Sequence, residues 1–346
     1  MNLKFMTEPP LNPALMTCPH CVGSHIWIHS QQERRFKCAT CKKTFAESRG
    51  TPLFNMRYPN WVVIMVLSLL ASGCPVQAIV FALSINEQTI ANWQRLAGEH
   101  AKIVQKTKVC TGQLCAEQIQ TDELWVKTQF GTVWMATGMA VFSRLFIWGT
   151  VNIERKVHVM EIVVKKIAQA LQRGHEILWV TDGYGGWEQA IRKHLRDPIY
   201  TGKLGRPRLQ PWPELQLVQV VKHKVARRLV DIEYRLRIGC WSTAKRLVCQ
   251  TQPELGVFNT SYIERLNATF RTWIPALTRR SRTPSRFRPH LEASMFWTGV
   301  IYNFCRIHAT LEATPAMAAG LTDEVWSVRD VLCCLQIRPK SIHATL

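Results

Sequence analysis

The sequence predicts an α/β protein, in which a mixed sheet with flanking helices is preceded by two small N-terminal modules. Three observations predict this class. Two CxxC pairs fall within the first 50 residues, and residues 59 to 100 show the apolar pattern of three successive helices. From residue 118 onward, three strand-like runs are followed by a helix and a further strand. A chain of 346 residues, 47% of them hydrophobic, has room for several modules with a substantial core.

The charge balance favours a polyanionic partner such as nucleic acid. Lysine and arginine number 44 against 24 acidic residues, and residues 201 to 300 alone hold 18 basic and 6 acidic side chains. An anionic membrane is the competing partner. The longest apolar run covers only residues 61 to 71, whereas a bilayer span needs roughly 20 residues, so we expect no membrane partner. The N-terminus lacks the features of an export signal, which favours a cytoplasmic protein.

Four cysteines predict a structural zinc site in a ribbon that covers residues 1 to 50. They occur as a CPHC pair and a CATC pair with sixteen residues between them, at Cys18, Cys21, Cys38 and Cys41. Each pair forms a tight turn that directs two thiolates at one ion, and two pairs complete a closed tetrahedral Zn²⁺ site. The runs between the pairs alternate apolar and polar residues, as a small hairpin does. Four unrelated free cysteines are the alternative.

A helical module is predicted for residues 51 to 105. The first helix contains the apolar run 61–71, a Ser-Gly-Cys-Pro break follows, and a second helix covers 76–83. Asn86 is a suitable N-cap for a third helix, which we expect to end near His100. This outline is typical of a helix-turn-helix module that binds DNA. Three core helices without any DNA contact would show the same pattern.

The largest predicted unit covers residues 115 to 310. Its three strand-like runs, its helix and its next strand are expected at 118–128, 132–142, 144–152, 156–173 and 176–182. This order predicts an antiparallel meander and an α/β core in which the first and fourth strands are neighbours. Residues 197 to 255 are basic and proline-rich, and we expect an insertion or extended connection there. Helical character is expected to resume at 261–273, and residues 311 to 346 form a C-terminal tail.

Three acidic residues are candidates for a catalytic metal site. Asp122 lies in the first strand, Asp182 ends the fourth, and Glu264 lies on the later helix. Carboxylate oxygens suit Mg²⁺ or Mn²⁺ better than zinc, and a pair of such ions supports phosphoryl transfer. Glu123 should point to the opposite sheet face, toward solvent or into a salt bridge. A simple turn at Asp182 and an ordinary surface role for Glu264 are the alternatives.

Several polar side chains around the later helix are candidates for DNA contact. Arg271 follows Glu264 by two helical turns, which places it on nearly the same face, where it can clamp a phosphate. Asn267 lies one turn from Glu264 and is a candidate for contact with DNA or a metal-bound water. Beyond this helix a basic segment adds further candidates: Arg279, Arg280 and Arg282. A solvated charged face is the alternative for any single arginine.

Six segments carry a resemblance to a known family: CPHC, CATC, TDELWVK, WVTDGYGGW, NTSYIERLNATFR and YNFCRIHATLEATPAMAAGL. Together they resemble insertion-sequence transposases of the Asp-Asp-Glu type, and most of all the class with an N-terminal zinc ribbon and helix-turn-helix. The resemblance implies a ribonuclease-H-like catalytic domain in which Asp122, Asp182 and Glu264 are the catalytic triad. It also implies that Arg271 is the basic residue that such enzymes often have two turns after the glutamate.

The resemblance implies an enzyme that cuts the ends of a mobile element and joins the 3′-hydroxyl to target DNA. Its partners are double-stranded DNA, as element ends and target, and its cofactors are Mg²⁺ or Mn²⁺ together with Zn²⁺. Because two ends are processed together, we expect a homodimer or higher oligomer on DNA. The alternatives are a non-catalytic DNA-binding regulator on a retired transposase scaffold and a structure-selective nuclease that cuts without joining.

Overall fold

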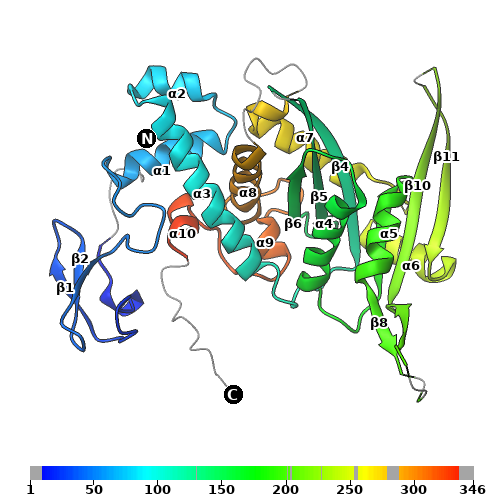
Figure 1. The fold of residues 1–346 in the computed structure, drawn as a ribbon, viewed down its shortest axis with the longest axis horizontal. Coiled ribbons are helices and arrows are strands. Elements are labelled where there is room, and N and C mark those ends of the chain that lie inside the picture. Colours follow the sequence, from blue (N-terminus) through cyan, green and yellow to red (C-terminus); the bar gives the residue numbers. More distant parts are fainter. Residues whose placement is uncertain are drawn as a thin grey trace.

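The computed structural model describes residues 10–129, 131–200, 202, 205–226, 228–252, 256–278 and 288–334. The molecule is elongated, with a small three-stranded unit at one end, helices next to it, then the large sheet, and two hairpins at the far end (Figure 1). Within these ranges, no helix combines the length and the apolar character that crossing a bilayer requires.

The N-terminal unit is a small antiparallel sheet in the order β1-β2-β3. Its elements are η1 (Pro13–Leu15), β1 (Ile26–Ser30), β2 (Arg35–Cys38) and β3 (Thr44–Ala46). The expected hairpin is present as β1 and β2, and β3 extends it by pairing with β2. A core of its own holds this unit together, made of Met16, Cys18, Phe36, Cys38 and Phe45.

Three helices follow: α1 (Asn60–Leu70), α2 (Val76–Leu83) and α3 (Glu87–Lys108). The predicted break contains Gly73 with φ +82°, where any Cβ would meet the backbone oxygen of Thr272 at 2.6 Å. Asn86 caps α3 as expected, because its side chain accepts a hydrogen bond of 2.8 Å from the backbone N–H of Gln88.

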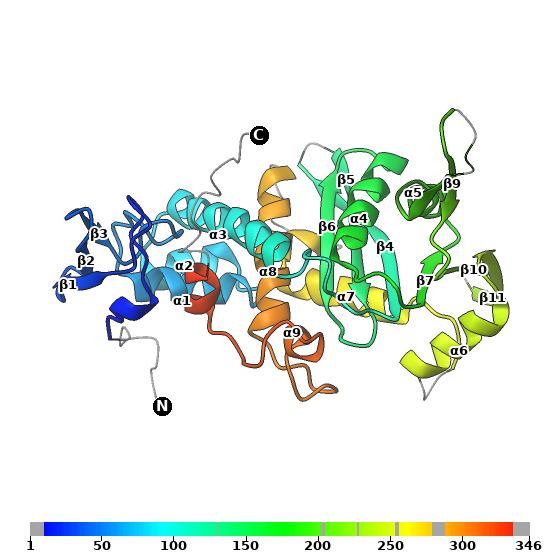
Figure 2. The ribbon, with the colours of Figure 1, turned by 90° about the horizontal axis from the view of Figure 1, so that it is seen from below.

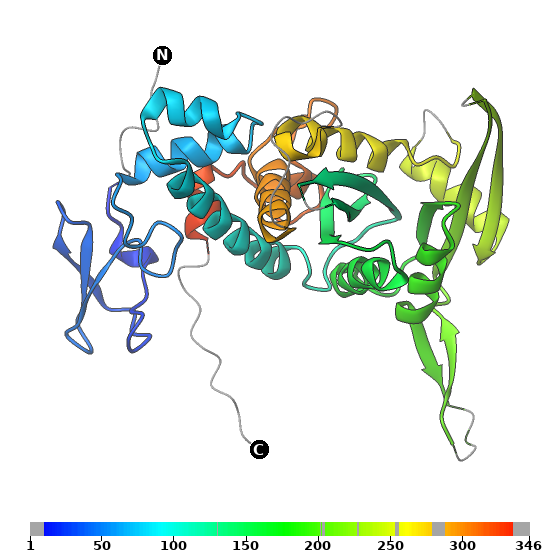
Figure 3. The same cartoon turned by 45° about the horizontal axis from the view of Figure 1, so that its top comes forward.

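Helix α3 is longer than the sequence pattern predicted. We expected the third helix to end near His100, but α3 continues to Lys108 and packs along helix α8 (Arg288–Phe304) (Figure 3). The cause is tertiary: Gln105 is fully buried, and its amide donates to the backbone oxygens of Phe146 and Ile147. One hydrophobic cluster therefore runs from the helical module through the α/β core.

The large sheet has six strands in the order β11-β10-β7-β4-β5-β6. The strands are β4 (Gln118–Thr128), β5 (Gly131–Ala140), β6 (Phe146–Asn152), β7 (Ile177–Asp182), β10 (Leu215–Val225) and β11 (Arg228–Ile238). The β4–β5, β5–β6 and β10–β11 pairs are antiparallel, whereas β7 lies parallel to both β4 and β10. The expected meander and the expected pairing of the first and fourth strands are both present. This mixed sheet is compatible with a ribonuclease-H-like core.

Helices cover both faces of the sheet (Figures 1 and 2). Helices α4 (Val157–Ala170) and α5 (Gly185–His194) pack on one face, and α6 (Trp241–Thr251) and α7 (Ser261–Trp273) pack on the other, while α8 lies against β6. The remaining elements are η2 (Pro275–Leu277), α9 (Pro315–Ala318) and α10 (Val328–Cys333). The β4 side chains alternate between these layers: Thr121 accepts from Trp179 on the α4–α5 side, whereas Gln120 bonds the backbone beside α7.

The region 197–255 differs from the expected insertion. It holds a hairpin of β8 (Arg196–Ile199) and β9 (Arg208–Pro211), followed by β10, β11 and α6. Helical structure therefore resumes at Trp241, earlier than predicted. Residues 215–220 of strand β10 are buried on both faces and include two buried glutamines, so this segment gives no alternating apolar and polar pattern to recognise.

Candidate metal centres

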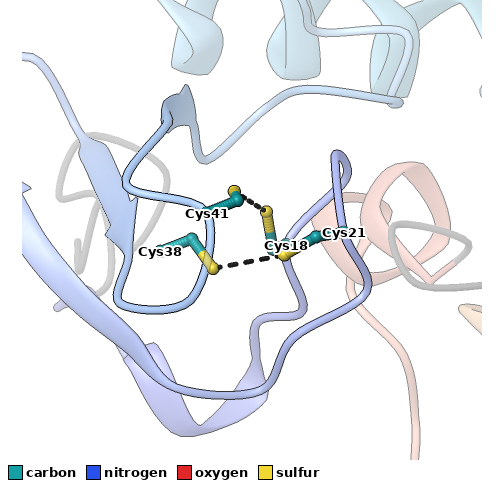
Figure 4. A group of neighbouring side chains, drawn as sticks. All are labelled: Cys18, Cys21, Cys38 and Cys41. Atoms are coloured by element: carbon teal, nitrogen blue, oxygen red, sulfur yellow. Dashed lines mark hydrogen bonds between the residues drawn. The ribbon is translucent and has the colours of Figure 1, made fainter.

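The four cysteines of the N-terminal unit converge on one point (Figure 4). The Sγ atoms of Cys18 and Cys41 lie 3.5 Å apart, as do those of Cys21 and Cys38, and all four lie within 4.8 Å of one another. A tetrahedron with Zn–S bonds of about 2.3 Å has sulfur–sulfur edges of about 3.8 Å. The sulfur–sulfur distance in a disulfide is about 2.05 Å, so the observed pairs are too far apart to be disulfides. The cluster therefore fits a tetrahedral ion such as Zn²⁺.

The two CxxC turns have the same backbone geometry. Backbone N–H groups of Val22 and Lys42 donate to the oxygens of Cys18 and Cys38, at 2.9 and 3.0 Å, and both donors have positive φ, 63° and 61°. Hydrogen bonds from backbone N–H groups, that of Cys41 first, lower the pKa of Cys38 to about 6. A backbone hydrogen bond from Gly23 lowers the pKa of Cys21, but burial and the neighbouring thiols outweigh it and raise that pKa to about 12. Because metal ligation needs the thiolate, binding of an ion would release protons from this cluster.

A second cluster of possible ligands lies between the two central strands of the large sheet, beside the C-terminal end of β7. Asp122 is on β4 and Asp182 is the last residue of β7, and the parallel register places Gln120 opposite Val180, so the two aspartates reach the same height. Carboxylate oxygens of Asp122, Glu123 and Asp182 all lie within 4.8 Å of one another. The structure thus brings together the two aspartates that the strand order placed side by side.

Glu123 is the member that the sequence did not predict. We expected it on the opposite face, in solvent or a salt bridge, and it does pair with Arg155. However, its side chain is only 2% exposed, and the Nε1 of Trp187 donates to it at 2.7 Å. The β4–β7 pairing ends at Gln120, so beyond this point β7 no longer flanks β4 and a carboxylate from either face can reach Asp182. The adjacent acidic residues within the first strand were the available signal.

Glu264 lies outside this cluster in the structure. Its carboxylate accepts hydrogen bonds from Lys222 Nζ at 2.6 Å and Thr260 Oγ1 at 2.8 Å, and its side chain is 51% exposed. Partial burial opposes ionisation, but the bond from Lys222 outweighs it and lowers the pKa of Glu264. The charge of Glu264 also contributes to raising the pKa of Asp122, so the two carboxylates interact electrostatically.

The candidate DNA contacts have different surroundings. Asn267 is 3% exposed, and its amide donates to Asp122 Oδ2 and accepts from Thr137 Oγ1, both at 2.9 Å. It faces Asp122 of the acid cluster, and the protein itself occupies both ends of its amide, whereas contact with DNA or a metal-bound water stays a prediction. Arg271 lines a cavity of about 160 Å³ together with Trp125 and Lys127. The other three candidates lie outside the described residues: Arg279, Arg280 and Arg282.

The electrostatics of the acid cluster favour a bound cation. Burial, and then the charges of Glu123 and Asp182, raise the pKa of Asp122 to about 7. Burial also raises the pKa of both neighbours, although Arg155 partly offsets the effect on them. Buried carboxylates that repel one another are stabilised by a divalent cation with oxygen ligands. The donor set therefore fits Mg²⁺ or Mn²⁺, as expected from the acidic residues.

Replacing Asp122 by asparagine is expected to stabilise the metal-free protein by up to about 4 kcal/mol at pH 8, since each unit of pKa shift corresponds to about 1.4 kcal/mol. A carboxyl whose pKa is raised on folding from 3.8 to about 7 contributes stability that is complete below pH 3.8 and is lost as the pH rises through 7. The amide carries no charge, and its oxygen can still accept from Asn267. Denaturant unfolding without added Mg²⁺, but with zinc retained, measures the difference, which should grow from about pH 4 to about pH 7 and then level off.

The matched control is Asp231→Asn, since Asp231 is an exposed carboxylate on β11. Added Mg²⁺ should raise the stability of wild type and of this control, but not that of Asp122→Asn. Equal stabilities of wild type and Asp122→Asn at pH 8 would contradict a strained carboxylate cluster.

Comparisons with known proteins give little further information. No protein-family profile and no curated protein matches the chain. Among solved structures, the chain is similar to a piggyBac transposase, determined by cryo-EM in a synaptic complex with hairpin DNA. The identity is 12% and the TM-score 0.36, and the similarity covers 81% of this chain and 71% of that chain. Values this low carry no conclusion about function.

Proposed function

We propose that this protein is a DNA transposase that cuts element ends and joins the 3′-hydroxyl to target DNA in a metal-dependent reaction. One observation carries the proposal. Asp122 and Asp182, from neighbouring parallel strands, bring their carboxylates within 4.8 Å of each other and of Glu123, beside the C-terminal end of β7. Such a site suits phosphoryl transfer, and the formal charge of +20 suits a nucleic-acid substrate.

The chain holds these carboxylates in place by hydrogen bonds. Asn267 orients Asp122, the backbone N–H of Tyr184 donates to Asp182 Oδ1 at 3.1 Å, and Trp187 donates to Glu123. Bound Mg²⁺ or Mn²⁺ would neutralise the phosphate charge and promote ionisation of the attacking water or 3′-hydroxyl. The role of the protein is to hold its ligands ready, so that little reorganisation is needed when DNA arrives.

Within this proposal, Glu264 is the third catalytic carboxylate. It lies on α7, one turn before Asn267. The side chain of Asn267 reaches Asp122. The ion pair with Lys222 must open for Glu264 to serve as a metal ligand. That pair is partly exposed, with 35% of the Lys222 side chain accessible, so its opening costs little.

DNA recognition is assigned to the basic surface and the N-terminal modules. We propose that the zinc-bound ribbon and the helices α1 to α3 recognise element ends. Arg271 and the arginines after α7, namely Arg279, Arg280 and Arg282, are proposed to contact phosphates. Two ends are processed together, so the active form is proposed to be a homodimer or higher oligomer on DNA.

The Lys222–Glu264 pair favours a second candidate function. In this structure an ammonium group neutralises the third acid, which is also what a retired catalytic scaffold would show. The protein would then be a non-catalytic DNA-binding regulator. Purified protein, labelled element-end DNA and target DNA with Mg²⁺, Mn²⁺ or no divalent metal separate these functions. Joined products support a transposase, cut but unjoined DNA indicates a nuclease, and binding without cutting under every metal supports the regulator.

DNA affinity is expected to fall steeply as salt rises. Each neutralised phosphate releases counterions and contributes about −0.9 to the slope of log K against log salt on duplex DNA. Engagement of about five phosphates would therefore give a slope near −4 to −5. Fluorescence anisotropy between 50 and roughly 200 mM salt measures this slope. A flat response would remove nucleic acid as the partner of the basic surface.

A further inference from the structure

A second side of α7 lines a cavity that the proposed reaction does not use. Asn267 points toward Asp122, whereas other α7 residues face a space of about 370 Å³. Most of the polar and aromatic lining comes from three regions, α7, the β5–β6 turn and the segment after α8: Arg144, Tyr262, Arg265, Trp273, Arg306 and His308. We name this space the arginine pocket. A cavity of this size matches small-molecule sites, which are commonly about 300–1,000 Å³.

The arginine pocket is strongly cationic. It contains three arginines, and its lining includes no aspartate or glutamate. Arg306 Nη2 donates to Ser72 Oγ at 2.7 Å, but among the described residues its buried Nε has no hydrogen-bond partner. Desolvation lowers the pKa of Arg306, yet a guanidinium stays protonated. Since a buried donor without a partner is costly, an anionic acceptor in the pocket would be stabilising.

Two of these arginines have their guanidinium groups over aromatic rings, which fixes their orientation. The Arg144 guanidinium lies 4.0 Å from the ring centre of Tyr262, and that of Arg306 lies 4.2 Å from Trp273. His308 accepts at Nδ1 from the backbone N–H of Thr310, which leaves Nε2 as the N–H donor of the neutral ring. Oriented guanidinium forks suit phosphate oxygens, and the flat aromatic groups suit a nucleobase.

We propose that the arginine pocket binds a phosphate group of a nucleotide, with the attached base against its aromatic side chains. The proposal deepens the proposed function, on which it rests for DNA as the source of the nucleotide. A nucleotide in a DNA strand and a free nucleotide share the recognised chemistry. Either ligand would supply oxygens for the arginine donors and a π-face for stacking on Tyr262 or Trp273.

The test uses the full-length protein without divalent metal other than the ribbon's zinc. Arg265→Gln is the main variant because Arg265 is exposed, so its loss leaves the fold intact. Arg246→Gln is the matched control, an exposed arginine on α6 outside the pocket that pairs with Glu176. Arg306→Lys keeps the charge but loses the planar fork. Anisotropy of a labelled five-nucleotide single strand gives affinity, with inorganic phosphate and dTMP as competitors.

We expect Arg265→Gln and Arg306→Lys to weaken strand binding about 10-fold or more, and Arg246→Gln less than about 2-fold. Stronger competition by dTMP than by inorganic phosphate would support base stacking. If dTMP displaces the labelled strand at concentrations as low as those at which unlabelled strand does, the ligand is a free nucleotide. If dTMP is needed at higher concentrations, the ligand is the strand. Equal affinities for Arg265→Gln and Arg246→Gln would overturn the pocket.

The outcome for the pocket is separable from the outcome for catalysis. Metal-dependent cutting and joining by the same variants is measured in parallel. Pocket-dependent strand binding in a wild type that never cuts would leave the pocket standing and remove the transposase. If the wild type cuts and joins DNA but Arg265→Gln leaves strand affinity unchanged, the transposase would stand and the pocket would be removed.

Discussion

The Asp182→Asn variant is expected to lose about 1000-fold or more of DNA cleavage and strand transfer while it still binds DNA. Carboxylate oxygens of Asp182, Asp122 and Glu123 lie within 4.8 Å of one another, so loss of the Asp182 carboxylate removes a metal ligand from the proposed site. The amide is nearly isosteric and its oxygen can still accept from the backbone N–H of Tyr184, so the strand end keeps its shape. Strand transfer on a gel and anisotropy with duplex DNA measure the two quantities.

Asp231→Asn controls for the change in net charge, because it removes an exposed carboxylate on β11. We expect this control to cut and join like wild type. Wild-type activity in Asp182→Asn would exclude the acid cluster as the catalytic site. Loss of DNA binding in Asp182→Asn alone would instead point to a folding defect, which denaturant unfolding of the same preparation detects.

Removal of zinc, or the Cys38→Ser variant, is expected to unfold residues 15–45 while the α/β core stays folded. Structural zinc contributes on the order of 10 kcal/mol in small domains. The ribbon has only a small core of its own, Met16, Phe36 and Phe45 with Cys18 and Cys38, which cannot replace that contribution. The hydrophobic cluster that runs from the helical module through the α/β core shares no residue with this small core. Hydrogen exchange resolved by segment, together with zinc content, measures this selective unfolding.

Cys115→Ser is the matched control, since Cys115 is an exposed free cysteine outside the ribbon. It should retain zinc and the wild-type exchange pattern. The Cys38→Ser variant should also bind element ends less tightly, and an unchanged footprint would show that the ribbon is dispensable for recognition. If the core unfolded together with residues 15–45, the ribbon would be part of one cooperative unit instead.

Local patterns predicted much of the fold. The CxxC spacing, the Asn86 cap and the meander of three strands all depend on residues close together in sequence, and the structure contains each of them. Strand β10 and the end of α3 escaped prediction for the same reason. Residues 215–220 of β10 are buried on both faces, and the end of α3 is polar in sequence yet packs against α8, so the surroundings of these segments are not encoded in their own periodicity.

The acid cluster shows the same division. The strand order alone made Asp122 and Asp182 neighbours, because the first and fourth strands pair in parallel. That Glu123 joins them depends on where the β4–β7 pairing ends, and that Lys222 holds Glu264 depends on how β10 and α7 meet. Sequence reasoning also left the arginines of the pocket without a role, since Arg144, Arg265 and Arg306 come from three distant segments.

By itself, the sequence determined the cysteine ligand set, the element order of the α/β core, the basic character of the chain and the two strand-borne aspartates. These depend on composition, spacing and periodicity, which act over a few residues. Only the tertiary structure decided which third carboxylate lies beside the aspartates and which arginines share a cavity. Side chains as far apart in the sequence as those of Arg144 and Arg306 meet only through packing, and burial then affects their charge and their hydrogen-bond partners.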